Sequence, residues 1–204
     1  MAKRCDREGP GGSVNPAEGR AVDAASGALD TGAGGPVGTL VPRDGEVYSM
    51  IAGADAMPPF LMAVASDTDL WMFVTSGGGL TAGRVDPDSS IFPYDTVDKL
   101  HDARYHTGPV TLLRVRRGGW GPALWQPFAE PHRERDGLER NIYKTPLGHR
   151  VIFEEINHEL GLAFRYRWAG GDEFGWVRTA TVENIVALPV TIELLDGVRN
   201  VLPW

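Results

Sequence analysis

The chain has 204 residues, enough for one domain and a tail, and its apolar fraction of 42% allows a hydrophobic core. A formal net charge of −7 disfavours the phosphate backbone of nucleic acid as a partner. No apolar run approaches the ~20 residues that cross a bilayer, which speaks against a membrane-spanning helix.

The single cysteine, Cys5, leaves no partner for an intrachain disulfide and cannot build a cysteine-based metal site. The start, Met1–Arg4, is basic like the first part of a signal peptide, but no apolar segment follows it. We therefore expect a cytoplasmic protein.

Residues 1–45 differ from the rest of the chain in composition. They are rich in Gly, Ala, Pro, Ser and Asp and contain few large apolar residues. Such a stretch buries too little surface to offset the entropy of ordering it. We expect a disordered tail here, with an upstream region included by a wrong start site as the alternative, and a folded domain over residues 46–204.

From residue 46 onward, short apolar runs alternate with turn signals, a pattern typical of strands. One helical turn is plausible near 97–104, and Pro122 and Pro127 reduce 120–128 to an edge strand at best. The other predicted strands are 61–66, 70–75, 80–82, 110–115, 141–144, 151–156, 162–168, 176–183 and 190–195.

The segment 162–168 gives the clearest pattern. Leucine and three aromatic residues alternate with alanine and two arginines, which predicts a strand with an apolar face inward and a charged face outward. The runs 151–156, 162–168, 176–183 and 190–195 are joined by short connections, so we expect them to form an antiparallel meander. Strands with short connections throughout predict an all-β fold, either a sandwich or a barrel.

No residue pattern predicts catalysis, a metal or a cofactor. Glu154 and Glu155 are adjacent on a strand and point to opposite faces, so they cannot serve one glycosidase site; we expect one to be solvated and the other paired or at a rim. His101 and His106 have no second compact pair to complete a zinc site. The triglycine Gly77–Gly79 lacks the lysine of a phosphate-binding loop and is interpreted as a turn.

The segment Leu80–Asp102 combines aromatic and charged residues, the mixture that sugar-binding sites use. An ordered loop that covers a sheet edge explains it equally well. The residues that we predict to contact a carbohydrate or an interface partner are Arg84, Phe92, Tyr94, Asp95, Asp98 and Lys99.

Two blocks in this segment, Leu80–Arg84 and Ile91–Asp98, follow a strand hairpin and a Gly-rich turn. With the later runs, they resemble the N-terminal domain of cellobiose and chitobiose phosphorylase-like proteins over residues 46–204. The chain departs from the family at the core motif, because it has Phe92–Tyr94 where the family has a motif that contains tryptophan. The later runs that carry the resemblance are 151–155, 162–168, 177–184 and 188–196.

The resemblance implies an antiparallel sandwich of the galactose-mutarotase-like kind, shorter than usual. In that family, the general acid and the phosphate site lie in a separate (α/α)6 barrel, so no catalytic residue carries over. It implies that the chain is a fragment, a truncated reading frame or a degenerate paralogue. Its role would then be to bind carbohydrate or to support assembly with the barrel or a second copy.

Two other functions compete with this expectation. A structural interaction domain would use unpaired strand edges and uncovered apolar surface to bind partners. A free-standing, lectin-like module would use exposed aromatic side chains, although aromatics at period two on a strand more often face inward. The aromatic residues that suggest such a module are Trp71, Tyr94, Trp120, Trp125, Trp168 and Trp176.

Overall fold

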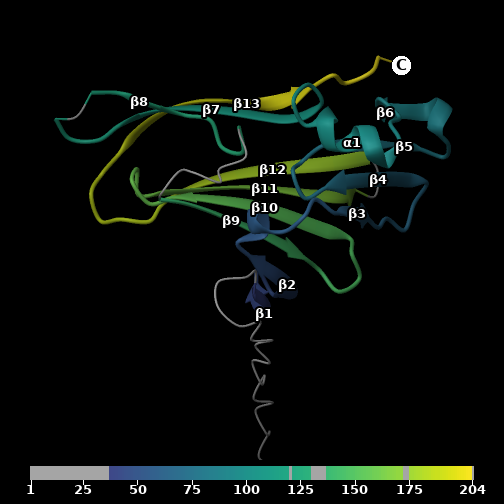
Figure 1. The fold of residues 1–204 in the computed structure, drawn as a ribbon, viewed down its shortest axis with the longest axis horizontal. Coiled ribbons are helices and arrows are strands. Elements are labelled where there is room, and N and C mark those ends of the chain that lie inside the picture. The colour runs from purple at the N-terminus through teal and green to yellow at the C-terminus, as the bar shows by residue number, and fades with distance from the viewer. Residues whose placement is uncertain (1–36, 120, 130–136, 172–174, 204) are drawn as a thin grey trace, which may run out of the picture.

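The computed structural model describes residues 37–119, 121–129, 137–171 and 175–203 (Figure 1). Strands dominate this part of the chain, and all strand pairs are antiparallel. The predicted all-β class is therefore confirmed. None of the helices in the described ranges has the length and apolar character needed to cross a membrane.

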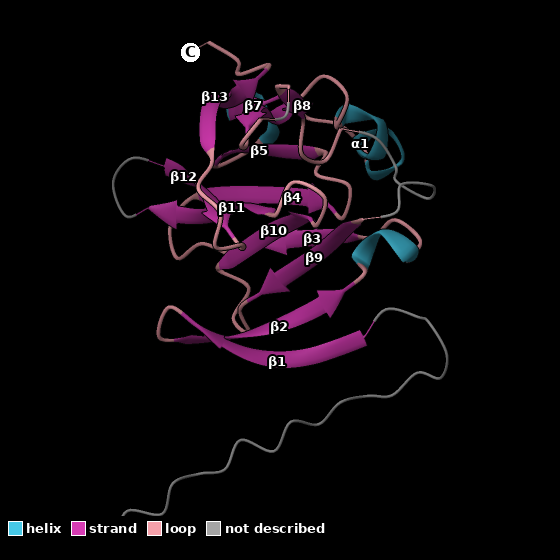
Figure 2. Ribbon diagram, turned by 90° about the vertical axis from the view of Figure 1, so that its left-hand side faces the viewer, coloured by secondary structure: helices cyan, strands magenta, loops and turns pink. Residues whose placement is uncertain are grey.

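A six-stranded sheet forms one layer of the fold, in the order β1-β2-β9-β10-β11-β12. Figure 2 shows the β1–β2 hairpin curving away at one end of this sheet. Its strands are β1 (Val37–Arg43), β2 (Glu46–Ala52), β9 (Leu138–Lys144), β10 (Arg150–Asn157), β11 (Leu162–Gly171) and β12 (Gly175–Asn184).

Two smaller sheets form the second layer. One has the order β3-β4-β5-β6, with β3 (Leu61–Val64), β4 (Leu70–Thr75), β5 (Leu80–Arg84) and β6 (Ser90–Phe92). The other has the order β13-β7-β8, with β7 (Gly108–Arg116), β8 (Ala123–Trp125) and β13 (Thr191–Arg199). Figure 1 shows β7, β8 and β13 stacked over β9–β12, and one core cluster joins residues of all three sheets. The fold is thus a two-layer sandwich.

Short helices connect the strands. They are the 3-10 turns Ala54–Ala56 and Pro87–Ser89, and α1 (Val97–Ala103). The predicted helical turn near 97–104 is therefore confirmed. Leu100 and Ala103 of α1 are buried, so the helix is fixed against the sandwich by its apolar side.

The alternation in β11 is confirmed. Leu162, Phe164, Tyr166 and Trp168 are buried between the two layers, and Arg165 and Arg167 lie on the other face of the sheet. Ring stacking adds to this burial, because the rings of Phe153 and Tyr166 lie 4.9 Å apart and 13° from parallel. Because a one-residue slip would place charged side chains in the core, this pattern specifies the register.

The predicted meander is only partly correct. Strands β9 to β12 follow one another in the sheet, but β13 leaves it and pairs with β7 in the opposite layer. Opposite charges support this pairing: Glu193 bonds to Arg116 and, at 3.2 Å, to Arg114. The predicted edge strand within 120–128 is confirmed as β8, at the edge of its sheet.

The folded region begins earlier than the expected boundary at residue 46. Residues 37–43, predicted as part of the tail, form β1 and pair with β2 in full register. Val41 packs against the buried side chains of Tyr48, Tyr143 and Ile152, and this small cluster explains why the segment is held. The remaining tail, residues 1–36, lies outside the described residues.

Candidate functional site

The six residues predicted for ligand contact do not form one site. Phe92 is 3% exposed, and its ring packs edge-on against Trp168 at 6.2 Å between centroids. Phe92 is therefore a core residue that cannot stack on a sugar at the surface. Arg84 ends β5 and lies 3.7 Å from Asp69 in an exposed ion pair. The segment Leu80–Asp102 is not a simple loop, because it contains β5, β6 and α1.

The remaining four lie at or near the start of α1. Tyr94 is 56% exposed and meets Trp71 edge-on, with ring centroids 5.9 Å apart. Asp98 and Lys99 are exposed and Asp95 is half-buried. A hydrogen bond from the Thr96 side chain lowers the pKa of Asp98 below its ordinary value. None of these residues lines the clefts described below.

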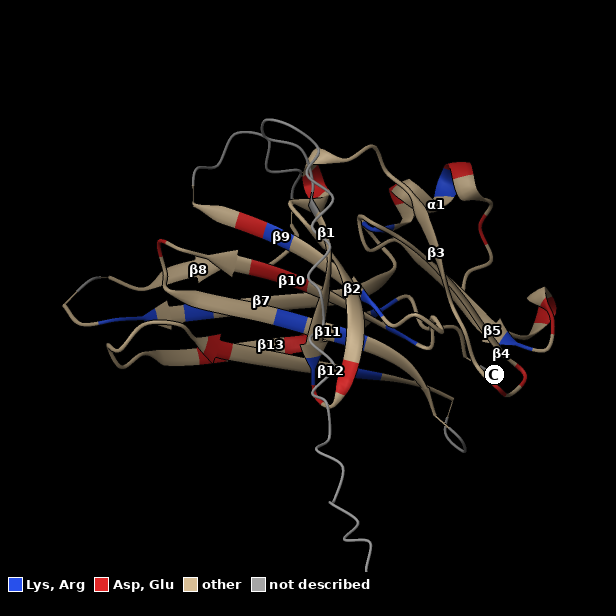
Figure 3. Ribbon diagram, turned by 90° about the horizontal axis from the view of Figure 1, so that it is seen from below, with Lys and Arg blue, Asp and Glu red and all other residues tan. Residues whose placement is uncertain are grey.

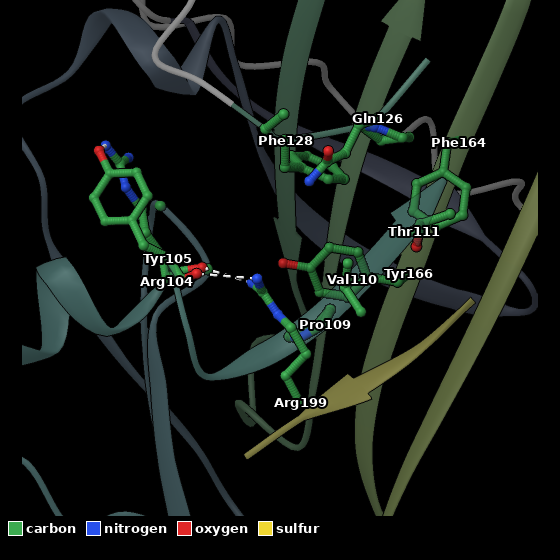
Figure 4. Close-up of a pocket in the computed structure, with 14 residues that line it drawn as sticks. Arg104, Tyr105, Pro109, Val110, Thr111, Gln126, Phe128, Phe164, Tyr166 and Arg199 are labelled. Atoms are coloured by element: carbon green, nitrogen blue, oxygen red, sulfur yellow. Dashed lines mark hydrogen bonds between the residues drawn. The ribbon is translucent and has the colours of Figure 1, made fainter. Parts of the chain in front are cut away.

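A cleft between the two layers brings together residues that the sequence did not single out (Figure 4). The space in and at the mouth of this cleft measures about 620 Å³. We call it the Tyr166 cleft, and its main polar and aromatic residues are Arg104, Thr111, Gln126, Phe128, Tyr166 and Arg199.

Six separate segments build the Tyr166 cleft, and one of them is the turn after α1 that carries Arg104 and Tyr105. Tyr166 comes from β11 and Thr111 from β7, on opposite layers of the sandwich. Arg199 is the last residue of β13, and its guanidinium donates to the backbone carbonyls of Tyr105 and Arg104 at 3.0 Å each. Residues 126–129 follow β8, and the turn between β4 and β5 closes the cleft.

The Gly-rich turn is confirmed, and it also makes room for the cleft. A Cβ atom at Gly77 would lie 3.0 Å from Nη1 of Arg104, and one at Gly78 would lie 3.0 Å from the Tyr166 hydroxyl. Gly78 also has a φ of 88°, in the region that favours glycine. These two glycines therefore let Arg104 and Tyr166 lie close to the turn.

The Tyr166 side chain is 3% exposed, and its hydroxyl points into the cleft (Figure 4). Among the described residues, this hydroxyl has no hydrogen-bond partner. Burial raises the pKa of Tyr166 well above its ordinary value of 10.0, although Arg178 and Arg140 oppose the shift. At neutral pH the hydroxyl is therefore protonated and can donate a hydrogen bond to a ligand.

Glu155 holds in place Phe128, which forms one wall of the cleft. Its carboxylate is 0% exposed and accepts hydrogen bonds from Trp125 Nε1 at 2.9 Å, the Phe128 amide at 2.8 Å and Arg140 Nε at 2.7 Å. The Phe128 backbone has a φ of 62°, which is unusual for a bulky residue. The bond to Glu155 helps to hold this conformation, and so places the Phe128 ring beside Tyr166, at 5.3 Å between centroids.

Glu154 lies on the other face of β10, as predicted, but the expectation that one of the two glutamates is solvated is wrong. Glu154 is 2% exposed and accepts hydrogen bonds from Asn141 at 2.9 Å, Tyr143 at 2.6 Å and Arg165. Both carboxylates are thus buried and fully paired, and the ribbon of β10 is coloured red at these acidic residues in Figure 3. Their bonding suits a structural role on each face of the sheet.

The environment of Glu154 predicts an acid-dependent stability. Burial alone would raise the pKa of Glu154, but hydrogen bonds from Tyr143, Asn141 and Arg165 outweigh it and hold the pKa below its ordinary value of 4.5. The ionised carboxylate therefore stabilises the fold above that pH. This contribution is lost as the pH falls through the lower folded-state pKa.

We expect the Glu154→Gln variant to unfold with a free energy roughly 3 kcal/mol below the wild type near neutral pH, because Arg165 loses its buried partner. The difference should shrink at about pH 2, where the wild-type carboxyl is also neutral. Urea unfolding of both proteins at the two pH values measures it. An equal difference at both would contradict the role of the charge.

A metal centre finds no support in the described ranges. No three side chains of His, Cys, Asp and Glu lie close enough together there to hold an ion. No protein-family model matches the chain, and no curated protein matches it in sequence. The case for function therefore rests on the fold and on the chemistry of the Tyr166 cleft.

Proposed function

We propose that this chain is a non-catalytic β-sandwich domain of a carbohydrate-active, glycoside phosphorylase-like protein in the cytoplasm, and that it binds carbohydrate in the Tyr166 cleft. One observation carries the proposal. The cleft brings aromatic rings, a hydroxyl, an amide and guanidinium groups together around one hollow. Aromatic faces with a few convergent polar groups are typical of small-ligand sites.

The rigidity of the cleft supports a role in ligand binding. Phe128 and Tyr166 are held by the aromatic stack, and Phe128 also by the Glu155 hydrogen bond. Side chains that are already fixed lose little conformational entropy when a ligand binds. The all-β sandwich is also the fold class that the resemblance implies for such a domain, whose partner would be an (α/α)6 barrel or a second copy.

The lectin-like alternative receives less support. Trp125 and Trp168 are buried and Trp71 and Trp176 are half-buried, while Trp120 lies outside the described residues. Tyr94 and Trp71 meet edge-on at 81°, so they offer no flat platform for a sugar ring. The structural-domain alternative keeps one specific observation in its favour: no strand in the described part of the chain pairs with the outer edge of the ten-residue strand β12.

Calorimetric titration with cellobiose and chitobiose tests the proposal. We expect saturable binding without cleavage when phosphate is added. Because the Tyr166→Phe variant loses one hydrogen bond and keeps the ring, its affinity should fall roughly two- to tenfold.

Tyr94→Phe is the matched control, since Tyr94 is exposed and lies outside the cleft. It should bind like the wild type. Binding that depends on Tyr94 and not on Tyr166 would place the sugar elsewhere. No binding at millimolar sugar would favour the structural role, and phosphate-dependent cleavage would overturn the non-catalytic assignment.

A further inference from the structure

The charge of the Tyr166 cleft is unusual for this molecule. The chain as a whole carries a net charge of −7, yet the described lining of the cleft contains two arginines and no Asp or Glu. An average surface of so acidic a chain would be negative, so the positive cleft is a local feature. Its two arginines are Arg104 and Arg199.

Neither arginine forms an ion pair with a described residue. Arg199 donates to two backbone carbonyls, and Arg104 donates to the Tyr105 hydroxyl at 2.6 Å. By contrast, most other arginines in the described ranges are paired with a carboxylate. Those that pair are Arg43, Arg84, Arg114, Arg116, Arg140, Arg150, Arg165 and Arg178.

The arginines at the border of the cleft do not add to its charge. Arg140 is paired with Glu155 at 2.7 Å, and Arg178 is paired with Asp196 at 2.6 Å. Asp55 and Asp102 line an adjoining hollow that shares Arg104, but neither forms an ion pair with it. Among the described residues, the positive charge that no carboxylate pairs with therefore belongs to Arg104 and Arg199.

Neutral and anionic ligands would use this arrangement differently. A neutral sugar would leave both guanidinium charges without a counter-charge inside a partly enclosed cleft. A carboxylate or phosphate would supply the missing charge and could accept from guanidinium N–H groups, which form stronger hydrogen bonds to ionised acceptors than to neutral ones. The Tyr166 hydroxyl, which points into the same space as the Arg199 guanidinium, is a further donor (Figure 4).

We infer that the Tyr166 cleft selects an anionic saccharide, one that carries a carboxylate or a phosphate group, and that Arg104 and Arg199 provide the positive charge that it recognises. The saccharide part of this inference rests on the proposed function. The anionic part rests on the charge of the cleft alone.

Binding of a matched series of ligands tests the inference on the wild-type protein. The probes are cellobiose, the same disaccharide with C6 oxidised to a carboxylate, its 6-phosphate and inorganic phosphate alone. We expect the two anionic sugars to bind about tenfold or more tightly than cellobiose, and to lose affinity as salt is added. A preference between the two identifies whether the carboxylate or the phosphate is the natural group.

The Arg104→Gln variant should lose this preference, so that it binds the two anionic sugars no more tightly than it binds cellobiose. Arg167→Gln is the matched control, because Arg167 also lacks an ion pair among the described residues but lies on the opposite face of the six-stranded sheet. Its binding should equal that of the wild type. Thermal unfolding of each variant verifies that it is folded, and the comparison of ligands on the wild type needs no variant.

Different outcomes would overturn carbohydrate binding and the selectivity for an anionic group. Equal affinity for cellobiose and the anionic sugars overturns the anionic selectivity and leaves carbohydrate binding intact. Phosphate alone binding as tightly as the sugar phosphate supports the anion site and contradicts a carbohydrate site. An anionic preference that survives in Arg104→Gln, or that disappears in Arg167→Gln, overturns the assignment to this cleft, and no binding by any probe overturns both ideas.

Discussion

The Glu155→Gln variant is expected to lose roughly 3–5 kcal/mol of its free energy of unfolding, about what breaking a buried ion pair costs. The carboxylate is fully buried, and its three donors are Trp125, the Phe128 amide and Arg140. A neutral amide keeps the size of the side chain but leaves Arg140 without its counter-charge. It also places two of its own hydrogens among groups that are all donors.

Chemical unfolding of the two proteins measures this loss. Glu193→Gln is the control, because Glu193 bridges Arg114 and Arg116 on the exposed surface, where such pairs contribute about 1 kcal/mol or less. Sugar binding should weaken as well in Glu155→Gln, since the Phe128 segment loses its anchor. If the two variants lose similar, small amounts, then the Glu155 network does not stabilise the fold as we describe.

The second large effect is expected for Gly79→Ala. A Cβ atom there would lie 2.1 Å from the Leu100 carbonyl oxygen and 3.1 Å from the Arg104 amide nitrogen. Both are backbone atoms at the C-terminal end of α1, so no side-chain rotation can relieve the clash. The helix must move away, which exposes Leu100, and we expect a loss of about 3 kcal/mol or more.

Thermal unfolding measures this effect, and Gly197→Ala is the matched control. Gly197 lies within β13, and a Cβ atom there meets nothing within 4 Å. Hydrogen exchange of α1 provides a second measurement, and its amides should lose protection before those of β11. An unchanged melting temperature for Gly79→Ala would mean that α1 does not pack against this turn.

Local patterns made a large part of the fold predictable. β11 follows from the alternation of large apolar and charged residues, and β9 to β12 follow one another because their connections are short. The position of β13 was not predictable in the same way. Its alternation fits either layer, and its partner β7, where Arg114 and Arg116 meet Glu193, is far away in the sequence.

The cleft could not be predicted, for three reasons. Glutamates on a strand normally face water, so Glu154 and Glu155 gave no sign of burial, and their donors come from several strands and loops. Tyr166 looked like any other core aromatic of β11. Arg104 and Arg199 are isolated in the sequence and meet only because β13 returns to the start of β7.

The pairing of β13 with the distant strand β7 affects the order in which the chain folds. The pairing of β7 with β13 joins Gly108 to Arg199, and the contacts of Arg199 with residues 104 and 105 span 95 and 94 positions. Contacts of such long range form slowly, because a large loop must close before they are made. The Tyr166 cleft therefore cannot be complete until β13 has paired with β7.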